Sequence, residues 1–193
     1  MSQLEPIRVK LTGTFPAERR EASLSIFAQP YDLEATGFYF SSLEEYEAKC
    51  AENFNSWGGL VEEYMIDICD GPMLACKLAS AIKLNQGNLQ AFLEALDWCD
   101  DDLVKACIMY DHIITNADFK DYDQSEAEGL YLYEDMSWRD VAEEFVDSGC
   151  LGDVPDHLSQ YIDYDMVARD LSYNGMFEAS VGNRDFIVDP SGV

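Results

Sequence analysis

Basic residues are scarce in this chain. Its 193 residues include 12 Lys and Arg against 38 Asp and Glu, which gives a formal net charge of −26. Nucleic acid is therefore disfavoured as a direct partner, because its phosphates would be repelled. Residues 1–20 hold four of the bases and two acids, whereas residues 94–170 hold 22 acids and four bases, a net charge of −18. So acidic a surface favours a basic partner, especially one that itself binds nucleic acid.

Histidine is equally scarce, and the cysteines are unpaired in sequence. The two histidines are His112 and His157, and no two cysteines form a CxxC pair. Zinc sites combine these residue types at short spacings, so no zinc site is predicted. We expect buried, free thiols, as is typical of a reducing cytosol. The cysteines are Cys50, Cys69, Cys76, Cys99, Cys107 and Cys150.

No motif of an active site is present. The chain has no glycine-rich phosphate loop and no Ser or Cys nucleophile motif beside a histidine. Asp121, Asp123 and Ser125 alternate as in a calcium loop, but Glu126 and Leu132 stand where an EF-hand needs Gly and Glu. Pairs of carboxylates arise by chance among 38 acids, so they do not indicate a glycosidase. We predict a protein that is not an enzyme and uses no metal or other cofactor.

Long apolar runs are also missing. The first ten residues, MSQLEPIRVK, lack the apolar region of a secretion signal, and no stretch approaches the length of a membrane-spanning helix. Hydrophobic residues nevertheless make up 48% of the chain, which is enough for a folded core. We therefore expect a soluble, cytoplasmic protein. A halophilic surface, or an acidic soluble protein of no special function, would also account for the charge.

The hydrophobic pattern indicates an α+β fold of three small domains, at 1–72, 73–122 and 123–193. In the first domain, apolar residues alternate with polar ones in several stretches, as in strands, and one stretch has the pattern of an amphipathic helix. In the second domain, apolar residues recur at helical spacing throughout. In the first domain we expect strands at 7–11, 22–28 and 62–69, and a helix at 43–54 capped by Ser42. In the second we expect helices at 74–82, 89–96 and 103–114, the last capped by the aspartates at 100–102.

The third domain, 123–193, starts within an acidic stretch, 120–128, that we expect to be a linker or an exposed loop. A helix over 135–148 is predicted, because its apolar and acidic residues occupy opposite arcs of a helical wheel. Gly149, Gly152 and Pro155 predict a turn after it. Strands are expected at 176–180 and 185–188, joined at Gly182 and Asn183 as a hairpin.

The stretch from 151 to 171, LGDVPDHLSQYIDYDMVARDL, resembles the signature of the ArdA antirestriction family. Members have a Leu-Gly-acid-Val-Pro turn, then Tyr-Ile-Asp-Tyr, then Arg-Asp-Leu, and the helix before this stretch also fits their pattern. Ala168 departs from the relatives, which carry Gly before the Arg-Asp pair. Alanine is the better helix former, so we expect no loss of fold.

The resemblance implies an inhibitor that mimics DNA. Proteins of the ArdA family are elongated homodimers with three small domains per chain, and mobile genetic elements carry them into bacterial hosts. They are acidic mimics of B-form DNA that occupy the DNA groove of Type I restriction–modification enzymes. The methyltransferase core and its specificity subunit form this groove. The expected result is protection of incoming DNA from restriction. Whether methylation is blocked too, and in which Type I families, is left open by the motif.

Two sets of residues follow from this interpretation. B-form DNA carries one charge per about 1.7 Å, so 26 charges correspond to roughly 44 Å of duplex. The predicted phosphate-like set is Asp97, Asp100, Asp101, Asp102, Asp118, Asp121, Asp123, Glu126, Glu128, Asp140, Glu143, Glu144 and Asp147. The set assigned to folding and dimer assembly is Leu151, Gly152, Val154, Pro155, Tyr161, Ile162, Asp163, Tyr164, Arg169, Asp170 and Leu171. We expect Arg169 to pair internally, with Asp165 or Asp170.

Two other functions fit the composition. The first is an acidic module that sequesters or chaperones another basic, nucleic-acid-binding protein. The second is a metabolic enzyme with halophilic acidity, which the missing motifs argue against. Inhibition of Type I enzymes with different DNA targets would distinguish mimicry from a dedicated partner, and turnover of a small substrate would favour an enzyme.

Overall fold

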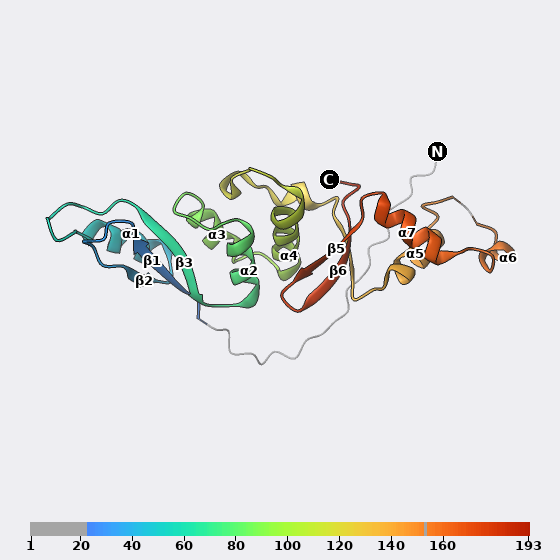
Figure 1. The fold of residues 1–193 in the computed structure, drawn as a ribbon, viewed down its shortest axis with the longest axis horizontal. Helices are drawn as coiled ribbons and strands as arrows, with labels where there is room; N and C mark the ends of the chain where they lie inside the picture. The colour runs from blue at the N-terminus through green and yellow to red at the C-terminus, as the bar shows by residue number, and fades with distance from the viewer. Residues whose placement is uncertain (1–22, 153) are drawn as a thin grey trace.

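The computed structural model describes residues 23–152 and 154–193 and shows an α+β protein extended along one axis (Figure 1). A three-stranded sheet with one helix lies at one end, a group of helices follows, and a second three-stranded sheet leads to the helices at the other end. The predicted α+β class is confirmed. The strand expected at 7–11 lies outside the described residues, as does Ala22 of the next one.

The first sheet is antiparallel, with the strand order β2-β1-β3. Its elements are β1 (Ser25–Pro30), β2 (Phe38–Phe40), α1 (Leu43–Glu52) and β3 (Tyr64–Asp70). Tyr46 of α1 packs on Phe40, with ring centroids 4.9 Å apart, and both are buried with Ile26 of the central strand. The Ser42 hydroxyl accepts a hydrogen bond from the Glu45 N–H, so the predicted cap is confirmed. The helix and two of the strands were expected, but β2 was not.

The helical group comprises α2 (Met73–Ala81), α3 (Leu89–Ala95) and α4 (Asp100–Ile108), and α4 continues as a π-helical turn, Met109–Ile113. Leu78, Phe92 and Val104, one from each helix, are completely buried. The three predicted helices are therefore confirmed. The expected aspartate cap is wrong in detail, because Cys99 is the N-cap residue and the aspartates at 100–102 form the first turn of α4. There they still face the positive end of the helix dipole.

The acidic stretch after α4 was expected to be a linker or an exposed loop. It forms two short 3-10 helices, Phe119–Asp121 and Gln124–Ala127, and most of its acidic side chains are exposed as expected. The stretch is nevertheless anchored to the core. Phe119 is buried and stacks on Tyr122 at 5.7 Å between ring centroids, and Ala127 is also buried. The acids here are thus held on a folded surface.

The second sheet has the antiparallel order β4-β6-β5. Its strands are β4 (Tyr131–Glu134), β5 (Phe177–Val181) and β6 (Arg184–Asp189), and the helices beyond it are α5 (Trp138–Asp147), α6 (Asp156–Ser159) and α7 (Tyr164–Tyr173). The register pairs Val181 with Arg184, so the predicted hairpin turn at Gly182 and Asn183 is confirmed. The predicted helix is confirmed as α5, whereas β4 was not predicted.

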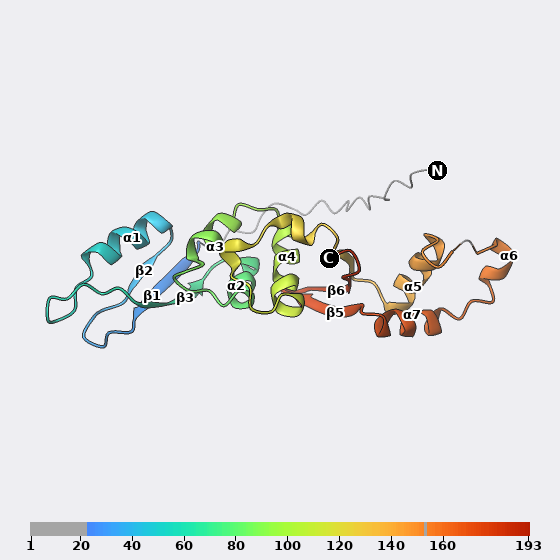
Figure 2. The same ribbon diagram turned by 90° about the horizontal axis from the view of Figure 1, so that it is seen from above.

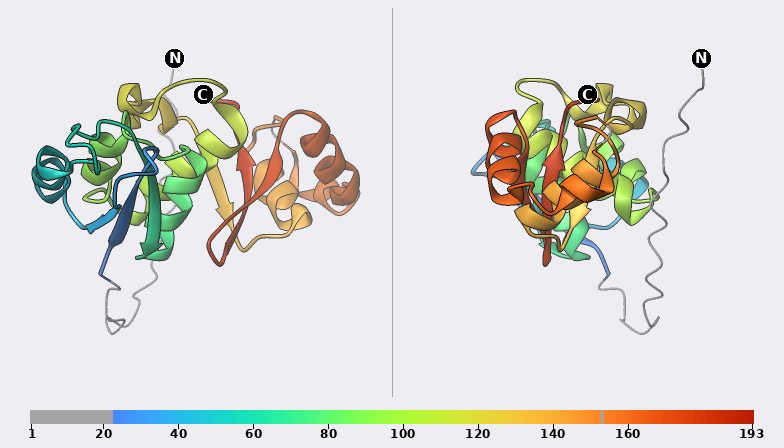
Figure 3. Two further views of the ribbon diagram at one scale, coloured as in Figure 1. Left: turned by 60° about the vertical axis from the view of Figure 1, so that its left-hand side comes forward. Right: turned by 90° about the vertical axis from the view of Figure 1, so that its right-hand side faces the viewer.

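Strand β6 is buried on both faces. Phe186 and Val188 belong to a core that runs from the first sheet through the helical group, and Ile187 points to a second core with Val141 of α5 and Leu171 of α7. Figures 2 and 3 show the sheet standing between the helical group and α5 with α7. The apolar packing is therefore continuous along the rod. Independent folding of the three domains stays a prediction.

The chain end packs closely against the start of β4. A Cβ atom added to Gly129 would overlap the backbone carbonyl of Gly192, so only glycine fits there.

Replacing Gly129 by alanine is therefore expected to lower the free energy of unfolding by about 1–3 kcal/mol, the usual cost of overpacking. Gly87→Ala is the matched control, because its added methyl would meet only the side chain of Asn85. Urea unfolding of the two variants tests the contact. Equal stability of both would contradict it.

Candidate functional site

The predicted phosphate-like residues are spread along the molecule and do not converge on a pocket. They lie on the turn from α3 to α4 and the start of α4, on the 3-10 helices, and on the outer side of α5. All are exposed except Asp102 and Glu143, which are half-buried. This arrangement has no resemblance to a catalytic constellation. It is a dispersed acidic surface.

Some of these carboxylates also stabilise helix ends. Asp123 accepts a hydrogen bond from the Ser125 N–H at 2.8 Å, and Asp140 accepts from the hydroxyl and N–H of Ser137 at 2.6 and 2.9 Å. These donors lower the pKa of both aspartates, because they stabilise the charged form. Glu126 completes the first capping box by accepting from the Asp123 N–H. Asp123, Glu126 and Asp140 therefore serve folding as well as surface charge.

Other members of the set are partly neutralised by bases. Asp118 lies 3.4 Å from the Lys120 ammonium, and Glu143 lies 3.1 Å from Arg139. Within residues 23–152 and 154–193, the remaining members except Asp101 have no Lys or Arg within salt-bridge distance. These unpaired carboxylates carry the free charge that a basic partner would meet.

Arg184 forms the most buried ion pair described in the chain. Its guanidinium holds Glu134 of β4 through two contacts, of 2.6 and 2.8 Å, and reaches Asp101 of α4 at 3.4 Å. This pairing lowers the pKa of Glu134, chiefly through the hydrogen bonds from Arg184. Arg184 thus ties the helical group to the second sheet. Sequence patterns do not predict this contact, because Arg184 is separated from Glu134 by 50 positions and from Asp101 by 83.

The motif at 151–171 divides into a folding part and an exposed part. Asp163 caps α7 by accepting from the Met166 N–H at 3.1 Å, and Leu171 is buried. In contrast, Leu151 and Tyr161 are 57% and 77% exposed. The turn forms as predicted, with φ values of 77° at Gly149 and 97° at Gly152.

The remaining members of the motif set also divide. Gly152, Val154, Pro155 and Asp170 are exposed, whereas Ile162 and Tyr164 are half-buried. Arg169 lies 4.0 Å from Asp170, which confirms the expected internal pair. The other candidate, Asp165, pairs with Arg139 instead, at 3.2 Å.

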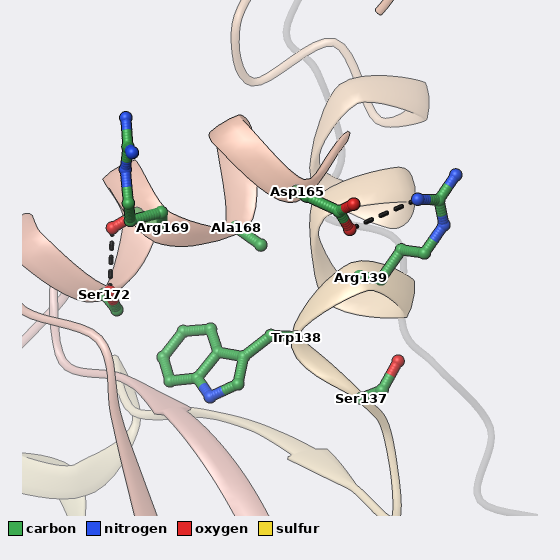
Figure 4. A pocket seen from close by; sticks show the side chains of 7 residues that line it. All are labelled: Ser137, Trp138, Arg139, Asp165, Ala168, Arg169 and Ser172. Atoms are coloured by element: carbon green, nitrogen blue, oxygen red, sulfur yellow. Dashed lines mark hydrogen bonds and ion pairs between the residues drawn. The ribbon is translucent and has the colours of Figure 1, made fainter. Parts of the chain in front are cut away.

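A surface hollow of about 470 Å³ lies between the start of α5 and α7 (Figure 4). Trp138 forms part of its wall and donates from Nε1 to Glu178 at 2.6 Å. Arg139 and Arg169 at its rim are each beside a carboxylate, so the hollow offers no uncompensated positive charge. The two serines that line it, Ser137 and Ser172, are engaged in helix hydrogen bonds, to the Asp140 carboxylate and the Arg169 carbonyl, and no histidine lines the hollow. Nothing in its chemistry indicates a substrate site.

The cysteines differ from the expectation of buried thiols. All six are free, but only Cys107 is buried, Cys50 is half-buried and the others are exposed. Burial raises the pKa of Cys107 to about 12. Of the exposed thiols, Cys69 lies on β3, Cys76 on α2, Cys99 just before α4 and Cys150 in the turn after α5, and the sequence pattern did not reveal their exposure. The described part of the chain has no group of His, Cys, Asp and Glu residues suited to a metal ion, and none of its helices is long and apolar enough to cross a bilayer.

Comparison with known proteins agrees with the motif. A family model described as "Antirestriction protein (ArdA)" matches residues 21–183. A search of the curated proteins gives no match. The matched range includes the first sheet, the helical group, α5–α7 and strands β4 and β5 of the second sheet, and it ends just before β6.

The Glu134–Arg184 pair gives a pH-dependent prediction. Replacing Glu134 by glutamine is expected to lower the free energy of unfolding by about 1–2 kcal/mol at pH 7. Because the folded-state pKa of Glu134 is lowered, the stabilisation is complete above the unfolded pKa, near 4.3, and is lost as the pH falls through the folded pKa. The difference between wild type and Glu134→Gln should therefore shrink towards pH 3.

Urea unfolding at pH 7 and pH 3 measures this difference. Glu144→Gln is the control, because Glu144 is exposed on α5 and has no basic partner within the described residues. A difference for Glu134→Gln that stays the same at both pH values would contradict the assignment.

Proposed function

Since the chain belongs to the ArdA family of antirestriction proteins, we propose that it acts as a mimic of B-form DNA in the groove of Type I restriction–modification enzymes. Antirestriction is the function of the family, and it consists of inhibition rather than catalysis. The proposed target is the methyltransferase core with its specificity subunit. Occupation of this groove would block restriction of incoming DNA, and modification as well wherever methylation uses the same groove.

The observation that supports mimicry best is the distribution of charge on an extended body. The acidic residues of α4 and of the 3-10 helices, which lie beside α3 and α4, and those of α5 beyond the second sheet are distributed along the rod, and most of them are exposed. A compact sphere could not present the same charge as a row. At one charge per about 1.7 Å of duplex, 26 charges correspond to roughly 44 Å of DNA. A basic groove shaped for duplex would attract such a rod over long range, without base-specific contacts.

A role as an acidic module for some other basic protein remains the alternative. It predicts binding to one dedicated partner. Mimicry predicts inhibition of Type I enzymes that recognise different DNA sequences, because phosphates are common to all of them.

The charge should act collectively. One Asp→Asn change is expected to weaken binding to a Type I methyltransferase by no more than about twofold, at roughly 0.3–0.5 kcal/mol per exposed charge. Neutralising eight carboxylates together should weaken it by about a hundredfold and reduce its salt dependence. The eight residues have no basic partner within the described residues, and all of them except Glu126 take no part in a capping box; they are Asp97, Asp100, Asp102, Asp121, Glu126, Glu128, Glu144 and Asp147.

A control with the same change in net charge uses eight exposed carboxylates outside the predicted set. They are Glu44, Glu47, Glu52, Asp67, Asp70, Asp111, Asp135 and Asp185. Isothermal titration calorimetry at several salt concentrations measures both the affinity for the methyltransferase and its salt dependence. The proposal predicts a smaller loss for the control. Abolition of binding by a single neutralisation would contradict a distributed surface.

Dimer assembly is proposed to use the exposed part of the motif around α6. Replacing Leu151 and Tyr161 together by serine should give a monomer in sedimentation velocity, because both apolar side chains would leave the interface. Tyr173→Ser is the control, since Tyr173 is 79% exposed but lies outside the motif. If the double variant sediments as a dimer, this face is not the interface.

A further inference from the structure

The end of the rod opposite α6 carries a second set of exposed apolar side chains. It consists of two loops, 31–36 and 53–61, which lie next to each other at the left of Figures 1 and 2 and which we call the N-terminal tip. Leu33 is 96% exposed and Trp57 is 85% exposed. Tyr31, Phe54 and Leu60 are each at least half exposed. Neither the fold nor the acidic surface accounts for these residues.

The two loops are braced against each other. The Ser56 N–H donates to the Glu34 carbonyl at 3.0 Å, and its hydroxyl donates to the Glu34 carboxylate at 2.8 Å. Asn55 donates to the Asp32 carboxylate at 2.7 Å and accepts from the N–H of Trp57 at 3.1 Å. The backbone around Trp57 is therefore held in place before any partner arrives. Such preorganisation lowers the entropy lost on binding.

The charge of the tip restricts what can cover it. The two loops contain no Lys or Arg, while Asp32, Glu34, Glu62 and Glu63 lie in or beside them. A nucleic acid or an anionic membrane would be repelled. The tip of a second copy of this chain would also be repelled, because acidic residues would face acidic residues. The complementary occupant is a protein surface with an apolar cleft and a rim of Lys and Arg.

We propose that the N-terminal tip is an apolar anchor, which inserts Trp57 and Leu33 into a basic-rimmed cleft of the same Type I methyltransferase whose groove receives the acidic surface. This inference rests on the proposed function. It adds a contact that does not imitate DNA, at the end of the charged row. Burial of a tryptophan in a desolvated pocket is typical of a binding hot spot, and burial of apolar side chains depends little on salt.

The test compares two kinds of variant in one titration against a purified Type I methyltransferase. Replacing Leu33 and Trp57 together by serine should weaken binding about tenfold or more at every salt concentration, with the salt dependence unchanged. The eight-carboxylate variant should instead change the salt dependence. Tyr173→Ser is the control for loss of an exposed aromatic residue, and should bind as wild type does.

A direct contact can be detected independently of affinity. Photoreactive benzoylphenylalanine placed at position 57 should crosslink to the methyltransferase, whereas the same group at position 173 should not. Wild-type affinity of the Leu33 and Trp57 double variant, or absence of a crosslink from position 57, would overturn the anchor and leave DNA mimicry standing. A change in its sedimentation would assign the tip to self-association and also overturn the anchor. No binding by the wild-type protein would contradict the proposed function itself, and the anchor with it.

Discussion

Strand β6 is buried on both faces, and the extended body depends on this packing. Its consecutive residues Phe186, Ile187 and Val188 point alternately to two cores, one shared with the helical group and the other with α5 and α7. A protein with a net charge of −26 is destabilised by self-repulsion when its charges are crowded. A rod separates the charges, but it needs apolar packing along its length. The second sheet, packed on both faces, supplies that packing at the junction between the helical group and α5 with α7.

Several charged side chains also stabilise the fold. Arg184 extends from β6 to Glu134 and Asp101, so one base spans the second sheet and the helical group. Asp123 and Asp140 cap helices while they remain exposed to solvent. Part of the acidic surface is therefore built from residues that also fix the elements that carry it. This coupling keeps the charges in fixed positions, which a mimic of a regular polymer requires.

Local patterns predicted α5 and the β5–β6 hairpin well. In α5 the apolar and acidic residues separate by helical period, and Gly182 with Asn183 marks the turn of the hairpin. Strands β2 and β4 were missed because they have only three and four residues, too few for an alternation, and they form by pairing with β1 and β6. The acidic stretch after α4 was misjudged because its anchors, Phe119 and Tyr122, are aromatic residues among many acids. Trp57 and Leu33 resemble core residues in sequence, and only the structure shows that they are exposed.

Competition with DNA tests the central claim most directly. A labelled duplex bound to a Type I methyltransferase would be titrated with the protein at two salt concentrations, with fluorescence anisotropy reporting the bound DNA. A mimic in the groove predicts stoichiometric release of the duplex, with weaker competition at the higher salt concentration because the contacts are electrostatic. A ternary complex that keeps its DNA would show that the protein binds elsewhere, and would contradict mimicry.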